Sequence, residues 1–327
     1  MKRYAIPSVL IAFVLLVAPI LRADVATTEK SSFKLEGFIG GMITKMAGGG
    51  GENASKMFLK GDRMATFGET TGSIIDLKEQ KIYSIDMKKK EYMVLTFAEM
   101  RAQMEEAKKN LEEQKKNMSQ ADKDSMAQVS KSVDFDIKTT ETGQKKQIAG
   151  YDTHEVVVTV AMHEKGKALE ESGGLVLTSN VWLGPKVPAM DELYQFSVRM
   201  MKAIFGEGFT GMDMRASAMA SSIIPGFGEA MSRSASELQK LSGTALSTTT
   251  VVEGVKSAEQ MKNAGSSQQQ PTGGGISGML AKKMMGNKGG TQQRTKALTT
   301  TRDVLSIGTC VSASDLEIPA GFKEKKK

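Results

Sequence analysis

Five short β segments separated by turn residues occupy residues 56–96, and they constrain the fold more than any other feature of the chain. The breaks after the first two segments carry Gly61-Asp62 and then Gly68 and Gly72. Short apolar runs at this spacing are typical of consecutive antiparallel hairpins. We therefore predict a β-meander, whose strands are residues 56–59, 63–67, 73–77, 81–86 and 91–96.

Later parts of the chain carry further strand patterns. Apolar and charged residues alternate from Val133 to Thr139, which predicts a strand with one solvent-exposed face. Residues 154–162 and 175–183 are largely apolar, and residues 243–252 and 297–311 are rich in threonine, valine and leucine. A total of about eight to ten strands suits one large sheet better than two domains. The predicted fold class is α+β, with a large curved antiparallel sheet that forms an open half-barrel.

Two helices interrupt the strand pattern. From Phe97 to Met118, apolar residues recur at helical spacing while the other faces carry Glu, Lys and Gln, which predicts a long amphipathic helix. This helix would lie across the sheet or pair with a partner coil, and docking to a receptor is the alternative. A second helix, from Leu193 to Phe205, has a wide apolar face and ends at Gly206, so we expect it to be buried against the sheet.

The first residues have the three-part pattern of a secretory signal peptide. Lys2 and Arg3 precede an uncharged run, and the small residue Ala23 closes it before Asp24. We predict cleavage after residue 23 and export to the periplasm or the medium. The alternative is a membrane anchor, although the run contains two prolines. Residues 24–327 would then form a single domain.

Three glycine- and methionine-rich insertions should interrupt that domain, at residues 37–51, 206–242 and 257–294. In the first and third insertions, glycine flanks soft apolar side chains, so flexible backbone would carry these side chains. We predict that they act as a lid or touch a membrane. The residues proposed for this role are Met42, Met46, Met279 and Met284.

Common catalytic and metal-binding patterns are missing from the sequence. One cysteine and two histidines cannot supply a disulfide framework or a Cys/His zinc site. There is no GxSxG, HExxH or P-loop motif. The net charge is +7, and acidic residues are interleaved with the basic ones, unlike the clustered basic patches of nucleic-acid-binding proteins. We predict no enzyme activity, no metal, no cofactor and no nucleic-acid partner.

We expect three notable side chains to lie in the folded interior. Cys310 lies among apolar and β-branched residues, which favours a buried thiol over a free one. Trp182 sits in a short apolar run just before a Gly-Pro pair, and burial of such a large ring usually reflects packing, as we also expect for Tyr151. Both rings should belong to the folded sheet and not to a ligand site.

Several segments together resemble an exported bacterial family that is classified only as a domain of unknown function, of the 4412 type. They read LKGDRM at residues 59–64, SIIDLK at 73–78, KIYSID at 81–86, IAGYDT at 148–153 and IPAGFK at 318–323. The resemblance implies the fold of the periplasmic lipoprotein carriers and their receptors, an open antiparallel sheet wrapped around helices with an apolar interior. It implies no catalytic residue.

We therefore predict a non-enzymatic periplasmic protein that binds a hydrophobic small molecule or lipid, such as an acyl chain. Alternate strand residues would line the cavity. They are Met57, Leu59, Met64, Ile74, Tyr83, Met93 and Leu95. Two alternatives remain open: a cell-envelope interaction module that docks a protein through its long helix and a sheet edge, and an unrecognised hydrolase.

Overall fold

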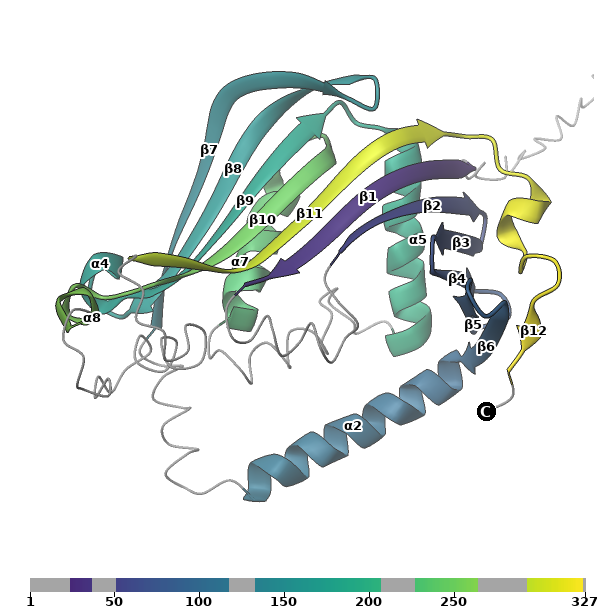
Figure 1. Cartoon of the computed structure of the whole chain (residues 1–327), viewed down its shortest axis with the longest axis horizontal. Coiled ribbons are helices and arrows are strands. Elements are labelled where there is room, and N and C mark those ends of the chain that lie inside the picture. Colours follow the sequence, from purple (N-terminus) through teal and green to yellow (C-terminus); the bar gives the residue numbers. More distant parts are fainter. Residues whose placement is uncertain (1–23, 37–50, 118–132, 207–226, 264–292, 326–327) are drawn as a thin grey trace, which may run out of the picture.

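The computed structural model describes residues 24–36, 51–117, 133–206, 227–263 and 293–325 of the chain. These residues form one open, curved sheet of twelve strands in the order β12-β6-β5-β4-β3-β2-β1-β11-β10-β9-β8-β7 (Figure 1). The strands are β1 (Val25–Leu35), β2 (Glu52–Lys60), β3 (Arg63–Gly68), β4 (Thr71–Asp76), β5 (Lys81–Asp86), β6 (Glu91–Thr96), β7 (Val133–Ile148), β8 (Tyr151–Glu164), β9 (Gly174–Gly184), β10 (Thr244–Val255), β11 (Arg294–Gly308) and β12 (Lys323–Glu324).

Two series of antiparallel neighbours build this sheet, and β1 joins them. Strands β2 to β6 follow one another as hairpins, as the turn pattern of residues 56–96 predicts. Strand β1 pairs with β2 on one side and with β11 on the other, so strands that are far apart in the sequence meet near the centre of the sheet. The expectation of a purely antiparallel sheet is wrong at one edge, because β12 pairs in parallel with β6.

The turns before and after β5 share one conformation. Asp76 and Asp86 each end a strand, and their carboxylates accept backbone N–H groups of the following turn, from Glu79 in the first turn and from Lys88 and Lys89 in the second. Each turn then closes on a residue with positive φ, 53° at Gln80 and 55° at Lys90. Asx-type bonds of this kind fix a tight reversal through local chemistry, which is why the hairpins can be recognised from sequence.

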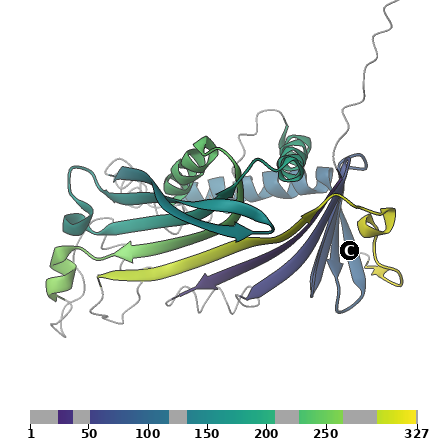
Figure 2. The ribbon, with the colours of Figure 1, turned by 90° about the horizontal axis from the view of Figure 1, so that it is seen from above.

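Three helices lie on one face of the sheet, here called the helix-bearing face (Figure 2). They are α2 (Phe97–Asn117), α5 (Pro188–Phe205) and α7 (Phe227–Lys240). Helix α5 packs Leu193 and Phe196 against Val25 and Leu59 of the β1–β2 region. Within the described residues, no helix is long and apolar enough to cross a membrane.

Helix α7 covers the strands at the other side of the helix-bearing face. Its Ala230 is fully buried in a cluster with Val160, Leu177 and Val252 of β8, β9 and β10. Leu238, near its C-terminal end, packs against Val181. Helix α7 lies inside the predicted insertion 206–242. The pattern of residues 206–242 did not reveal a helix there, because alanine and serine supply much of its inward face.

The opposite face of β3 to β5 is covered by the chain that follows β11. Val311 and Leu316, the latter in the 3-10 helix η2 (Ala313–Leu316), pack with Ala65, Ile74 and Ile85. Two short helices, α4 (Leu169–Ser172) and α8 (Ala258–Asn263), lie together at one end of the sheet (Figure 1). Leu169 of α4 packs with Val176 and Val255, again on the face away from α5 and α7.

Two assignments to the interior need correction. Cys310 is exposed, because it lies in the segment just after β11, where the neighbouring Val311 and not the thiol turns toward the sheet. The Trp182 ring is only half-buried, on the face away from the helices, and the Lys146 ammonium lies 3.9 Å from its centroid. Tyr151, by contrast, packs at the margin of the α5 cluster.

Candidate functional site

A band of polar side chains crosses the helix-bearing face between the α5 and α7 clusters. Residues directly opposite in an antiparallel pair share a face. Val252 and Leu177 pack under α7, so Thr250 and Ser179, two positions along each strand, lie on that same face. Thr300 of β11 is opposite Thr250. We call the band the central polar strip; it consists of Thr27, Glu29, Arg302, Thr300, Thr250 and Ser179.

A bidentate ion pair occupies the middle of the strip. Arg302 Nε donates to Glu29 Oε2 at 2.8 Å, and Arg302 Nη2 donates to Glu29 Oε1 at 2.6 Å. The Glu29 side chain is 10% exposed, whereas the Arg302 side chain is 42% exposed. The pair uses two of the five N–H donors that a guanidinium carries. One side of the cation is therefore held by Glu29 and the other side is accessible.

Three hydroxyl groups show how the strip is bonded on either side of the ion pair. Ser179 Oγ and Thr250 Oγ1 lie 2.9 Å apart and satisfy each other. Thr27 Oγ1 is buried and has no hydrogen-bond partner among the described residues. Buried hydroxyls without a partner are rare in native structures and call for an explanation such as an absent ligand or water. The strip therefore contains a guanidinium that is accessible on one side and a buried hydroxyl without a hydrogen-bond partner among the described residues.

We expect the Glu29–Arg302 pair to be energetically coupled. Truncating one partner leaves the other charge without its bonds, so a double-mutant cycle with Glu29→Ala and Arg302→Ala should give a coupling free energy of about 1–3 kcal/mol in urea unfolding.

The exposed pair Lys30–Glu52 provides the control for this cycle. These side chains are 42% and 66% exposed, and solvent screens such pairs, so the same cycle there should give at most about 1 kcal/mol. Equal coupling at the two pairs would show that the Glu29–Arg302 pair is an ordinary surface contact.

Five of the seven residues predicted to line a cavity lie on the helix-bearing face. Leu59 is buried in the cluster under α5, and Met57 and Met64 pack at its margin. Ile75 of the same cluster pairs with Ile82, and Ile82 pairs with Leu95, so Leu95 lies on that face. Met93 is two positions from Leu95 on the same strand and therefore lies on that face too. Met93 is 47% exposed. The three side chains near α5 meet protein atoms and form packed core.

Ile74 and Tyr83 lie on the opposite face, so the prediction that they line the same space is corrected. Ile74 is opposite Tyr83 and is fully buried beneath Val311 and Leu316. The Tyr83 hydroxyl donates to Glu79 Oε2 at 2.9 Å, and burial followed by this bond raises the pKa of Tyr83. Alternation along a strand separates two faces, but it cannot show that Met64 and Ile74 belong to different ones.

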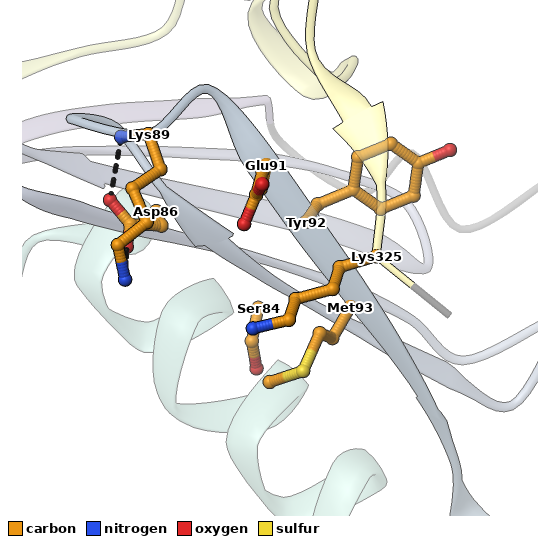
Figure 3. Close-up of a pocket in the computed structure, with 7 residues that line it drawn as sticks. All are labelled: Ser84, Asp86, Lys89, Glu91, Tyr92, Met93 and Lys325. Atoms are coloured by element: carbon orange, nitrogen blue, oxygen red, sulfur yellow. Dashed lines mark hydrogen bonds and ion pairs between the residues drawn. The ribbon is translucent and has the colours of Figure 1, made fainter. Parts of the chain in front are cut away.

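The predicted lid residues Met42, Met46, Met279 and Met284 lie outside the described residues. A small pocket of about 130 Å³ lies at the β5–β6 edge of the sheet, within the described part of the chain (Figure 3). Its lining residues are Ser84, Asp86, Lys89, Glu91, Tyr92, Met93 and Lys325. Ligand sites for drug-sized molecules usually measure about 300–1,000 Å³, so this pocket is too small for an acyl chain.

Sequence reasoning missed the central polar strip completely. Strand β1 was not predicted, because Val25, Thr27 and Glu29 alternate with equally polar residues and no turn signal precedes them. Arg302 lies 273 positions from Glu29, so the pair exists only through the β1–β11 register. The threonine runs at residues 248–250 and 299–301 are the one local signal that could have drawn attention to this part of the sheet.

The site offers no catalytic grouping that we can recognise. Among the described residues, no three His, Cys, Asp or Glu side chains come together in a way that could hold a metal ion. Comparison with known proteins found no matching family model and no matching curated protein.

Proposed function

We propose that the protein is an exported, non-enzymatic binding protein that takes an amphipathic ligand with an acyl chain on the helix-bearing face. The anionic head of the ligand would meet Arg302, and the chain would lie along the neighbouring apolar side chains. The observation that carries this proposal is the central polar strip, in which a partly exposed guanidinium and an unpartnered buried hydroxyl lie on one face of the sheet between two apolar clusters.

Charge chemistry favours an anionic head. Glu29 binds one side of the Arg302 guanidinium, and the Arg302 side chain is still 42% exposed. A carboxylate or phosphate that reached the accessible side of Arg302 would gain charge-assisted hydrogen bonds. The unpartnered Thr27 hydroxyl lies on the same face and could donate to the head group or to a bridging water.

The same face also supplies an apolar contact for a tail. Phe33 is opposite Thr300 and its ring is 44% exposed, although it is a large apolar side chain in a central strand. Each methylene buried against such a surface contributes about 0.8 kcal/mol. An acyl chain of ordinary length could therefore bind at micromolar concentration after its ordering cost is subtracted.

A titration with a fluorescent fatty acid tests the proposal. The parent should bind saturably, and Arg302→Gln should weaken binding by about tenfold, the value of one charge-assisted hydrogen bond. Phe33→Asp should weaken it at least as much, because it places a charge in the path of the tail. Phe33 is exposed, so this second variant should fold even if loss of Arg302 disturbs Glu29.

Arg294→Gln is the matched control for this titration. Arg294 lies on the same strand as Arg302 but pairs with Glu253 on the opposite face, so the charge change is equal and the site is untouched. Saturable binding that is lost in Arg302→Gln and kept in Arg294→Gln supports the proposal. A parent that binds no fatty acid, or equal affinities in all variants, contradicts it.

A second candidate function, a protein interaction module, is favoured by one observation. Strand β7 forms the end of the sheet, and its side chains from Asp136 to Gln147 are exposed. A long exposed edge strand can accept a strand from a partner protein. Charged side chains such as Lys138 and Glu141 on this edge oppose unspecific pairing, so we rank this function second.

A further inference from the structure

The parallel pairing of β12 with β6 brings two lysine-rich segments together at one edge of the sheet. The backbone N–H of Lys323 donates to Lys90 O at 3.0 Å, and that of Lys325 donates to Tyr92 O at 2.8 Å. Lys88, Lys89 and Lys90 form the turn before β6. These five lysines, which we call the lysine edge, are all exposed.

The turn geometry does not require these lysines. The preceding turn also has an Asx bond to its third residue and a positive φ at its last one, yet it reads Leu77-Lys78-Glu79-Gln80 and carries no excess charge. Gln80 O even accepts the N–H of Phe97 in the way that Lys90 O accepts that of Lys323. The accumulated charge at the second turn is therefore a property of the surface and not of the fold.

The acidic neighbours neutralise the lysine edge only in part. The backbone N–H of Lys89 lowers the pKa of Asp86, and the Lys89 ammonium, 3.3 Å away, lowers it further. Among the described residues, Lys88, Lys90, Lys323 and Lys325 form no ion pair. Figure 3 shows the Lys325 side chain extending over Ser84 toward Met93, so ammonium groups and an exposed apolar side chain share one surface.

We propose that the lysine edge docks the protein on a bilayer surface that contains anionic lipids. The five lysines outnumber the acidic residues beside them, Asp86, Glu91 and Glu324, and lysine is depleted from protein interfaces relative to arginine. Clustered lysines are, by contrast, attracted to anionic headgroups. The exposed Met93 provides an apolar group that can enter the interface.

Vesicle sedimentation tests this proposal, with vesicles of equal parts phosphatidylcholine and phosphatidylglycerol at a lipid concentration that pellets about half of the parent protein. The triple variant Lys88→Glu, Lys90→Glu and Lys323→Glu should lose at least about tenfold in partition coefficient. Added salt should release the parent, because exposed charges are screened. The three lysines make no ion pair among the described residues, so the variant should melt at the parent's temperature.

The control is a second triple variant with Lys138→Glu, Lys145→Glu and Lys296→Glu. It changes the net charge by the same amount at exposed positions remote from β6. All three proteins carry the same N-terminal segment, so any bilayer affinity of that segment is common to them. Equal sedimentation of parent and lysine-edge variant overturns the proposal. Binding to immobilised polyglutamate without binding to vesicles overturns it as well and points to an acidic protein partner. Neither result depends on fatty-acid binding at Arg302.

Discussion

Replacing Phe196 by alanine should lower the free energy of unfolding by about 3–5 kcal/mol. Phe196 is fully buried on α5 and lies in one cluster with Val25 and Leu59 of the central strands. Truncation removes apolar area that holds α5 to the sheet and leaves a cavity that neighbouring side chains fill only in part. Urea unfolding followed by circular dichroism measures the effect.

Tyr194 provides the control on the same helix. Its side chain is 60% exposed, so Tyr194→Ala removes a ring of similar size from the solvent side. The expected change is within about 0.5 kcal/mol. If the two substitutions had equal effects, α5 would not be packed on the sheet through the face described, and the separation of the helix-bearing face into two clusters would be wrong.

Replacing Ile74 by alanine should cost about 2–5 kcal/mol and leave ligand binding unchanged in protein that is still folded. Ile74 is fully buried on the face opposite α5, under Val311 and Leu316. Its loss creates a cavity beneath the segment that follows β11. The melting transition reports the stability, and the fatty-acid titration reports the binding.

Met93→Ala is the comparison that separates the two faces. Met93 was predicted together with Ile74 to line the cavity, but it is 47% exposed, so its truncation should change stability by no more than about 0.5 kcal/mol. A small effect at Ile74, or a loss of ligand affinity there with unchanged melting, would restore Ile74 as a ligand contact and refute the assignment of faces.

Local chemistry explains which parts of the fold were predictable. The hairpins of residues 56–96 can be read from sequence because Asp76 and Asp86 fix their turns through bonds to residues two or three positions ahead. Strand β1 has no such local signal. It pairs with β11, and the paired residues of the two strands are more than 260 positions apart in the sequence. The hydrogen-bonded hydroxyls of Ser32 and Thr301 are an example.

The candidate site could not be predicted for a related reason. Alternation shows that neighbouring strand residues face opposite ways, but only the packed helices show which face is which, as Met64 and Ile74 demonstrate. The polar strip needs four strands in register, and Glu29 meets Arg302 across the pairing of β1 with β11. Hydrophobic patterns also predict only which apolar residues are buried. They say nothing of polar residues such as Thr27 and Thr250.

Photo-crosslinking tests the central claim, that an amphipathic ligand lies on the helix-bearing face between α5 and α7, most directly. A fatty acid with a photoreactive group near its carboxylate is bound, irradiated and located by peptide mass spectrometry. We predict saturable labelling in the peptides that contain Glu29, Thr250 and Arg302, with competition by unlabelled fatty acid. Labelling confined to the opposite face, around Ile74 and Leu316, or labelling that unlabelled fatty acid does not reduce, would contradict the account.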